Sequence, residues 1–597
     1  MKSRVRIFLF YYISWLLLFM AQKPIFLALY GSSDHEIGYG DYLQVLWHGL
    51  PLDLSCAAYV TVVMGLLLVA SVFVRNMHII QRIAEAYTCC VLAIVLLIMI
   101  GDLGLYGDWR FRIDKTIFIY MDSPKNVLAC APWYVWLGGT LSWLVLLSLL
   151  GSGYHVMLTR LFASVERCTW PTSIGLFVLS ALLFLPIRGS LSVATLNTGR
   201  VYYSENQLLN HAAINPVFNM MESLGERTFD ASRYTYMDRM QADSLVRAQY
   251  IYKESTEQLL RVKRPNIFLI IMESFSANAM AAMPNVSRYA QEGVNFSNCY
   301  SGSFRTDRGV VCVLSGFPGQ PTSSLMKVPS KAEHLPFLSR DLEDAGYHLR
   351  FYYGGDENFT SMRSYLTAGG FRDRVSISDF TLQESHSKWG AHDHTLFSRV
   401  INTYDEVEKP YFQTILTLSS HEPFEVPFSK YEDPFLTSVA YTDSCIGSLV
   451  EELRQSSEWD STLVIMVADH GYHYPQGVDF HSPLRYRIPM IMTGGALCEP
   501  QIIETGCAQI DLAPTLLAQM ELPNSHYYFG KDVMKTKRED GFAYFSFVDG
   551  FGWVNDKGTI VIDAKADQTI YFEGNTIGTD SIVRAYTQRV YEVIDKL

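Results

Sequence analysis

Five long apolar runs in the first third of the chain constrain its fold more than any other feature. An α-helix needs about 20 residues to cross a bilayer, and each run approaches or exceeds that length. The runs are Ile7–Tyr30, Leu54–Val74, Ala84–Tyr106, Tyr134–Leu158 and Pro171–Ile187. We therefore expect residues 1–190 to form a transmembrane domain of five helices.

Charged residues between the runs predict how this domain is oriented. The first run follows the basic start MKSRVR, but it is too long for a signal peptide and further runs follow, so we expect an uncleaved anchor. Basic residues flank the second and fourth gaps, whereas the first gap holds only acidic ones. The positive-inside rule then places the N-terminus in the cytoplasm and everything after the fifth run outside. The third gap departs from this pattern, since it carries Arg110, Arg112, Lys115 and Lys125.

The acidic excess of the chain lies after the membrane runs. Of the 48 basic and 60 acidic residues, 13 and 10 respectively fall within residues 1–190. Nucleic acids are held mainly by clustered Lys and Arg, so this acidic remainder argues against a nucleic-acid partner.

Ten cysteines contain no CxxC pair, so neither a zinc knuckle nor a redox motif is indicated. Cys498 and Cys507 are close enough in sequence to form a disulfide, with two free buried thiols as the alternative.

Residues 191–263 are polar and mixed, and we interpret them as a helical extracytoplasmic linker. The stretch NHAAINPVFNMMESL suggests an amphipathic helix, and a second, charged helix is expected from Met237 to Lys263.

From Pro265 onward, short apolar runs alternate with helical patterns, which is typical of an α/β domain with a largely parallel sheet. The run NIFLIIM reads as a buried strand that ends at Glu273, and TLVIMVA ends at Asp469 and His470. Ligands collect beyond the carboxyl ends of strands in such sheets. If the two runs are adjacent strands, these three side chains converge there.

A hydroxyl stands in SFRTDRG, where Thr306 precedes the short buried helix expected for VVCVLSGF. Backbone N–H groups at a helix N-terminus favour an anion such as phosphate. A threonine hydroxyl is a weak nucleophile unless a base or a metal activates it. The plainer alternative is that Thr306 is an ordinary helix cap.

Two carboxylates, an imidazole and a hydroxyl form a plausible ligand set for one divalent cation. Oxygen ligands suit Mg or Mn, while one His in a set of four also suits Zn. Such a cation would lower the pKa of the Thr306 hydroxyl and polarise a phosphoryl oxygen. Taken singly, Glu273 could instead be an acid near a helix start, and Asp469 an Asx cap.

Eight motifs follow one another along the chain: NIFLIIMESFS, SFRTDRG, GGDENFTSMR, LSSHEPF, YTDSCIG, VADHG, RIPMIMTGG and QIDLAPTLL. In this order they resemble the alkaline phosphatase/sulfatase superfamily, and within it the lipoteichoic acid synthase-type membrane phosphoglycerol transferases. The resemblance implies a sulfatase-like catalytic domain over residues 264–597.

The resemblance also implies roles for individual residues. Glu273, Thr306, Asp469 and His470 would bind one divalent cation, Mn before Mg or Zn, and Thr306 would become phosphorylated. Arg363 and His421 would contact the phosphate headgroup, with Asp356 as a further substrate-binding residue. His481 is either another phosphate contact or a structural histidine.

Two departures from the family pattern qualify this expectation. A sulfatase has a Cys or Ser nucleophile with Pro two places on and Arg two places beyond that, whereas here the candidate nucleophile is Thr306 and is followed by Asp307 and Arg308. This pattern argues against sulfate ester hydrolysis. The typical synthase has a Trp two places before its Arg, where this chain has Ser361. Recognition of the headgroup or the acceptor is therefore expected to differ.

The expected function is transfer of a phosphoglycerol-type headgroup from a membrane phospholipid, through a phospho-threonine, to an extracytoplasmic glycan or lipid acceptor. The alternatives are a phosphoethanolamine transferase, a phosphodiesterase or phosphatase that uses water, and a non-catalytic membrane protein. The expected location is a bacterial cytoplasmic membrane, with several spans and the catalytic domain outside.

Overall fold

The computed structural model of the chain divides into two compact units, Met1–Glu226 and Arg227–Leu597. It describes residues 1–31, 37–109, 111–115, 117–118, 133–191, 193–204, 206–225, 229–385, 387–479 and 481–597. Arg110, Lys125 and Cys130 lie outside these ranges.

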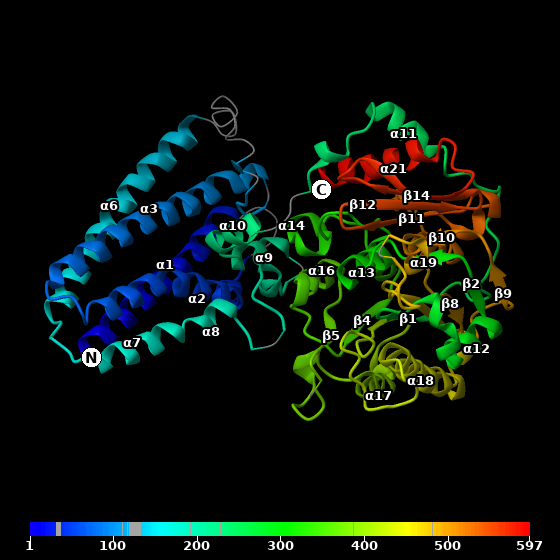
Figure 1. Cartoon of the computed structure of the whole chain (residues 1–597), viewed down its shortest axis with the longest axis horizontal. Coiled ribbons are helices and arrows are strands. Elements are labelled where there is room, and N and C mark those ends of the chain that lie inside the picture. The colour runs from blue at the N-terminus through cyan, green and yellow to red at the C-terminus, as the bar shows by residue number, and fades with distance from the viewer. Residues whose placement is uncertain are drawn as a thin grey trace. The chain divides into compact units, whose positions relative to one another are not determined.

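Within the described residues, the first unit contains five helical segments long and apolar enough to cross a membrane (Figure 1). They are α1 (Lys2–Tyr30), α2 (Tyr39–Ala70), α3 (Met77–Trp109), α6 (Trp133–Ala163) and the pair α7 (Pro171–Ala181) and α8 (Phe184–Arg188). The expectation of five spans is confirmed by length and composition. A helix suits this setting because it satisfies its own backbone polar groups.

The expected amphipathic helix of the linker is two short helices within the first unit. α9 (Gln207–Ala213) ends before Asn215, and α10 begins at Pro216 (Pro216–Gly225). Proline has no N–H to donate and is well accommodated at the first position of a helix, so the break falls there.

The expected charged helix from Met237 to Lys263 is mostly wrong. Only α11 (Arg239–Arg247) is helical, and the Asp238 side chain caps its start. Further along, Tyr252 and Leu260 form backbone bridges with Thr536 and Leu497. Pairing with distant segments therefore overrides the helical pattern.

The second unit is built on an eight-stranded sheet in the order β5-β4-β6-β1-β7-β8-β2-β9. Its central strands β4, β6, β1 and β7 run parallel, and β8 is antiparallel to its neighbours. The strands are β1 (Asn266–Met272), β2 (Val294–Phe296), β4 (His348–Tyr353), β5 (Asp373–Val375), β6 (Tyr411–Leu416), β7 (Thr462–Ala468), β8 (Met490–Thr493) and β9 (Gln501–Ile503). The expected mostly parallel α/β sheet is confirmed.

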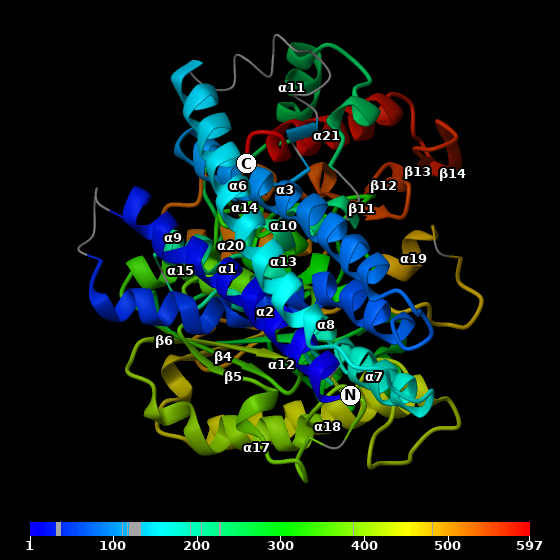
Figure 2. The same ribbon diagram turned by 90° about the vertical axis from the view of Figure 1, so that its left-hand side faces the viewer.

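Helices cover both faces of this sheet (Figures 1 and 2). α17 (Asp393–Thr403) and α18 (Pro434–Gln455) lie on one face, and α13 (Thr306–Ser315) and α16 (Met362–Ala368) lie on the other. The other α-helices in the described residues of this unit, besides α11, are α12 (Pro284–Glu292), α14 (Pro329–Ala332), α15 (Leu338–Asp344), α19 (Pro483–Tyr486), α20 (Leu512–Gln519) and α21 (Thr579–Ile594).

Two smaller sheets complete the second unit. β11 (Phe542–Phe547), β12 (Gly550–Asn555), β13 (Gly558–Asp563) and β14 (Gln568–Gly574) form an antiparallel meander. β3 (Cys299–Tyr300) pairs with β10 (Cys507–Ala508), which brings Cys507 opposite Cys299. Cys498 is exposed and Cys507 is buried, and both are free thiols, so the disulfide alternative for this pair is wrong.

Candidate active site

The two central strands β1 and β7 bring three potential metal ligands together at their carboxyl ends. The strands pair in parallel with Met272 opposite Ala468, so Glu273 lies beside Asp469 and His470. One ligand atom from each of these three residues lies within 4.8 Å of the others. The expected convergence of residues about two hundred positions apart is confirmed.

Thr306, at the start of a helix between these two strands in the sequence, also lies at this cluster. It is the first residue of α13, and its Oγ1 donates a hydrogen bond to Glu273 Oε2 at 2.9 Å. Arg305, in an extended conformation, occupies the N-cap position. The helix-cap alternative for Thr306 is therefore wrong, because its hydroxyl faces a carboxylate instead of its own backbone.

Close backbone packing fixes α13 against the turn after β7. A Cβ at Gly309 would stand 1.9 Å from the Asp469 carbonyl oxygen, so only glycine permits this approach. Gln509 secures the same turn: its Nε2 donates to Asp469 O at 2.6 Å, and its Oε1 accepts from Gly302 N at 2.9 Å. The glycine of TDRG and the glutamine of QIDLAPTLL are thus explained by packing.

Hydrogen bonds orient the two carboxylates. Ser274 N and His470 N donate to Asp469 Oδ1 at 2.8 and 2.6 Å, and Ser274 Oγ donates to Glu273 Oε1 at 2.8 Å. Ser274 adopts a left-handed backbone conformation with φ of 59°, which is uncommon for serine. The chain bends sharply at the strand end and presents both acids on one side.

Burial and mutual charge shift the pKa values of these three groups. Burial would raise the pKa of Glu273, but the hydrogen bond and charge of His470 outweigh it and lower that pKa. Burial and the neighbouring Glu273 charge raise the pKa of Asp469. Burial would lower the pKa of His470, but the Asp469 and Glu273 carboxylates raise it.

The donor set fits a divalent cation. Asp469 Oδ2 is buried and makes no hydrogen bond, with His470 Nε2 3.6 Å away, and a carboxylate oxygen buried without a hydrogen bond is costly unless an ion binds it. The Thr306 hydroxyl, the two carboxylates and the His470 imidazole supply oxygen and nitrogen ligands of the type that Mn, Mg or Zn accept. Perturbed pKa values of clustered buried groups also mark functional sites.

Arg363 is positioned by an acidic partner. Its Nη1 lies 3.5 Å from Glu357 Oε1, and Arg374 Nε lies 3.0 Å from Glu357 Oε2. In the loop between Glu357 and Arg363, Thr360 and Ser361 have φ values of 53° and 62°, so two left-handed residues precede α16. The Arg363 side chain is about one quarter exposed.

Asp356 begins the same loop and closes a local turn. Its Oδ1 accepts hydrogen bonds from the backbone N–H and side-chain amide of Asn358, at 3.0 and 2.7 Å. Its predicted contact with substrate stays a prediction.

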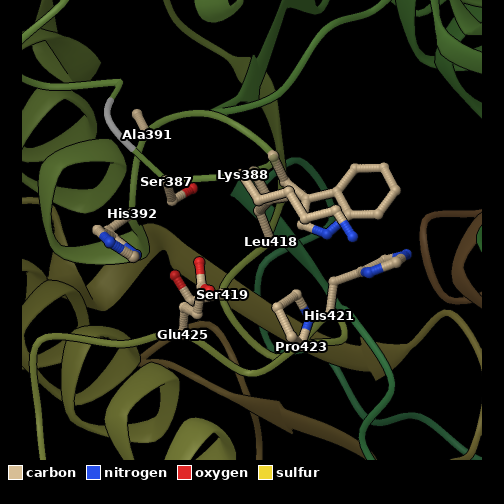
Figure 3. A pocket seen from close by; sticks show the side chains of 10 residues that line it. Ser387, Lys388, Ala391, His392, Leu418, Ser419, His421, Pro423 and Glu425 are labelled. Atoms are coloured by element: carbon tan, nitrogen blue, oxygen red, sulfur yellow. The ribbon is translucent and has the colours of Figure 1, made fainter. Parts of the chain in front are cut away.

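His421 lies beyond the end of β6, next to a tryptophan. The Trp389 and His421 ring centroids are 4.1 Å apart. Figure 3 shows His421 at a narrow hollow with Lys388, Ser387, His392 and Glu425 around it. The hollow has room for little more than a water molecule.

His481 lies near the meander, where its ring centroid is 6.4 Å from that of Phe547. Its predicted phosphate contact stays a prediction, as does the role of each other site residue. Sequence reasoning missed Trp389, Glu357, Arg374 and Gln509. Glu357 and Gln509 lie within the motifs GGDENFTSMR and QIDLAPTLL, which could have drawn attention to them. Trp389 and Arg374 lie in no motif, and their importance depends on contacts between distant segments.

Comparisons with known proteins agree with this architecture. Residues 265–522 match the family model described as Sulfatase. The chain is 25% identical over 301 residues to phosphoglycerol transferase I of Xanthomonas campestris pv. campestris (strain B100), covering 46% of this chain and 43% of that protein. It is 20% identical over 337 residues to lipoteichoic acid synthase 1 of Bacillus subtilis (strain 168), covering 49% and 51%. The chain thus spans about half the length of these relatives.

Two solved structures share the fold. A protein of the alkaline phosphatase superfamily from Vibrio parahaemolyticus aligns with a TM-score of 0.54 and 24% identity, covering 62% of this chain and 98% of that one. The lipoteichoic acid synthase LtaP from Listeria monocytogenes aligns with a TM-score of 0.50 and 14% identity, covering 60% and 97%. Residues 265–522 therefore match the Sulfatase family model and have the alkaline phosphatase-like α/β fold, in a chain whose described N-terminal residues include five helices long and apolar enough to cross a membrane.

Proposed function

We propose that this protein transfers a phosphoglycerol-type headgroup from a membrane phospholipid to an extracytoplasmic glycan or lipid acceptor. One observation carries the proposal: the Thr306 hydroxyl, at the start of α13, donates to Glu273 inside a cluster of potential metal ligands. The names of the relatives, phosphoglycerol transferase I and lipoteichoic acid synthase 1, support this reaction class.

Glu273, Thr306, Asp469 and His470 would hold the divalent cation, with Mn first and Mg or Zn as alternatives. When bound, such an ion lowers the pKa of a coordinated hydroxyl and offsets charge on a phosphoryl oxygen. The chain's own residues then account for positioning and proton movement.

In the first step Thr306 Oγ1 attacks the phosphorus of the phospholipid diester. The new Oγ1–P bond forms as the bond from phosphorus to the diacylglycerol oxygen breaks, and the proton that Thr306 Oγ1 loses is balanced by the one that diacylglycerol gains as it leaves. The hydrogen bond to Glu273 Oε2 holds the Thr306 proton away from the attacking lone pair. Free N–H groups in the first turn of α13 favour the phosphoryl oxygens.

In the second step an acceptor hydroxyl attacks the phospho-threonine and releases Thr306. Arg363 would offset charge on the phosphoryl group, and His421 would take the proton of the acceptor, which balances the proton that restores the Thr306 hydroxyl. Two inversions at phosphorus, one in each step, would leave its configuration retained.

The donor and the acceptor class define the alternatives. A phosphoethanolamine transferase would use the same residues on another phospholipid, and a phosphodiesterase would pass the phosphoryl group to water.

The five apolar helices support a location in the membrane, next to the phospholipid donor, and we propose that the second unit faces away from the cytoplasm.

The test is the mass of the covalent intermediate. Purified full-length protein with Mn is incubated with mixed bacterial phospholipids, quenched in acid and mapped by peptide mass, with Thr306→Ala as the control. A phosphoglycerol adduct on Thr306, absent from the control, is the expected result. A phosphoethanolamine adduct would establish the alternative donor, and no adduct with Mn, Mg or Zn would contradict the covalent scheme.

A further inference from the structure

The His421 side chain is held in one tautomer by its own neighbour. Its Nδ1 lies 2.9 Å from the Glu422 carbonyl oxygen, and a carbonyl can only accept a hydrogen bond. Nδ1 therefore carries the proton in the neutral ring, and Nε2 carries the lone pair. This is the arrangement that a base needs in order to take a proton at Nε2.

Trp389 contacts both members of this hydrogen bond. Its indole Nε1 donates to the same Glu422 carbonyl oxygen at 2.7 Å. Its ring packs against the imidazole, with centroids 4.1 Å apart at an interplanar angle of 49°. One side chain thus restrains the His421 ring and also the carbonyl oxygen that orients it.

The aromatic contact continues into the loop that carries Arg363. Phe359 packs its ring on Trp389 at 5.7 Å and 69°, an edge-to-face arrangement. Phe359 directly precedes Thr360 and Ser361, the two left-handed residues at the entry to α16. Trp389 therefore lies between two segments that each supply one predicted headgroup contact.

We propose that Trp389 is a positioning residue for the transfer of the headgroup from Thr306 to the acceptor. It acts through His421, whose Nε2 it keeps available for the acceptor hydroxyl. The adjoining hollow, lined by Lys388, His392 and Glu425 among others, admits a group of hydroxyl size (Figure 3). The effect on transfer to the acceptor rests on the proposed function, whereas the restraint of the His421 ring by Trp389 does not.

The substitutions Trp389→Phe and Trp389→Leu separate the two contacts. Phenylalanine keeps a ring against His421 and loses the N–H donated to Glu422, whereas leucine loses both. With glycerol as the probe acceptor, we expect Trp389→Leu to slow decay of the Thr306 adduct by about tenfold, Trp389→Phe to slow it less, and adduct formation to change little. The matched control is Trp459→Phe, whose indole lies against Arg454 in another part of the unit.

A double-mutant cycle tests whether Trp389 acts through His421. In a His421→Ala background, Trp389→Leu should have no further effect on adduct decay, because the group that it positions is gone. Equal slowing by Trp389→Leu in both backgrounds would overturn the proposal. So would a Trp389→Leu variant whose adduct decays at the wild-type rate.

The restraint of His421 by Trp389 can also be tested by chemical modification, which needs no turnover and therefore does not depend on the proposed function. Acylation of His421 by diethyl pyrocarbonate, followed by peptide mass, should be several-fold faster in Trp389→Leu, because the indole that packs against the imidazole no longer shields it from this bulky reagent. Acylation of exposed His334 should stay unchanged. If the wild type forms no adduct, the proposed function fails, and the acylation rates still decide whether Trp389 restrains His421. Equal rates at His421 in wild type and variant would show that it does not.

Discussion

At the scale of single residues, the decisive contact is the hydrogen bond from Thr306 to Glu273. It joins a helix start to a strand end and places a hydroxyl among potential metal ligands. The sequence alone indicated both elements, because Glu273 follows one buried apolar run and Thr306 precedes another. It could not show that Thr306 is the first helical residue instead of the cap, since that depends on the conformation of Arg305.

The first prediction concerns Thr306 as the nucleophile. Thr306→Ala should lower turnover of phospholipid by at least about a thousandfold, because no other group takes the place of a lost nucleophile. Thr306→Ser keeps a hydroxyl at the same position and should retain part of the activity. The measurement is release of diacylglycerol from labelled phospholipid, with circular dichroism as the check on folding. Substantial turnover by the alanine variant would contradict a covalent mechanism.

The second prediction concerns the metal ligands. Asp469→Asn should lower the metal content of the purified protein, because it removes charge at a buried oxygen that has no hydrogen bond. Adding Mn at a hundredfold excess over its Kd should stabilise the wild type by about 2.7 kcal/mol and the variant much less. Elemental analysis and thermal unfolding report the two effects. An unchanged metal stoichiometry would show that the ligand set is wrong.

At the scale of elements, the loop before α16 depends on a chain of charges. The partly buried Arg374 pairs with one carboxylate oxygen of Glu357, and Arg363 lies near the other. Burial lowers the pKa of Arg374, and the Glu357 carboxylate opposes that effect. The sequence motif GGDENFTSMR marked this loop, but nothing in it pointed to Arg374, which follows on β5.

The third prediction tests this chain of charges. Arg374→Ala should free the Glu357 carboxylate to pair with Arg363 alone and draw the guanidinium away from the substrate. We expect KM for phospholipid to rise several-fold with a smaller effect on kcat, and Arg374→Lys to restore part of the loss. Arg372→Ala is the matched control, since Arg372 is exposed and pairs with Glu343. An equal effect of both alanine variants would contradict the argument.

In the first unit, two buried cationic side chains, Lys23 and Arg112, hold the end of α9. Lys23 Nζ lies 3.1 Å from Asp53 Oδ1 and also donates to the Ala213 carbonyl oxygen at 2.8 Å. Arg112 Nη2 pairs with Asp102 Oδ2 at 2.8 Å, and its Nη1 donates to the His211 carbonyl oxygen at 2.6 Å. Both carbonyls belong to the last turn of α9, where helix carbonyls run short of backbone donors and favour nearby cations.

The fourth prediction concerns the Lys23–Asp53 pair. Lys23→Met should destabilise the membrane unit by about 3–5 kcal/mol, because it leaves Asp53 buried without a counter-charge. Lys23→Met combined with Asp53→Asn should be less damaging than Lys23→Met alone. Thermal unfolding of the full chain in detergent compares them. A double variant less stable than the single one would contradict a role for the unpaired charge.

At the scale of the whole molecule, the sequence predicted the division into membrane helices and an α/β domain, because both follow from the length and period of apolar runs. The linker was harder: residues 207–225 belong to the first unit, and α11 belongs to the second. Backbone bridges at Tyr252 and Leu260 replace the expected helix, and such distant pairing leaves no local signal. The orientation in the membrane rests on loop charges alone and is therefore the point to test.

The fifth prediction uses two native cysteines to test that orientation. Cys498 is the exposed one of the five cysteines in the second unit, all of which lie in described residues, and Cys168 follows the helix α6. If the second unit faces away from the cytoplasm, a membrane-impermeant maleimide should label Cys498 in spheroplasts and reach Cys168 only after permeabilisation. Cys498→Ser and Cys168→Ser identify the labelled positions. The opposite pattern would place the site on the cytoplasmic side, away from an extracytoplasmic acceptor, and the proposed transfer could not stand.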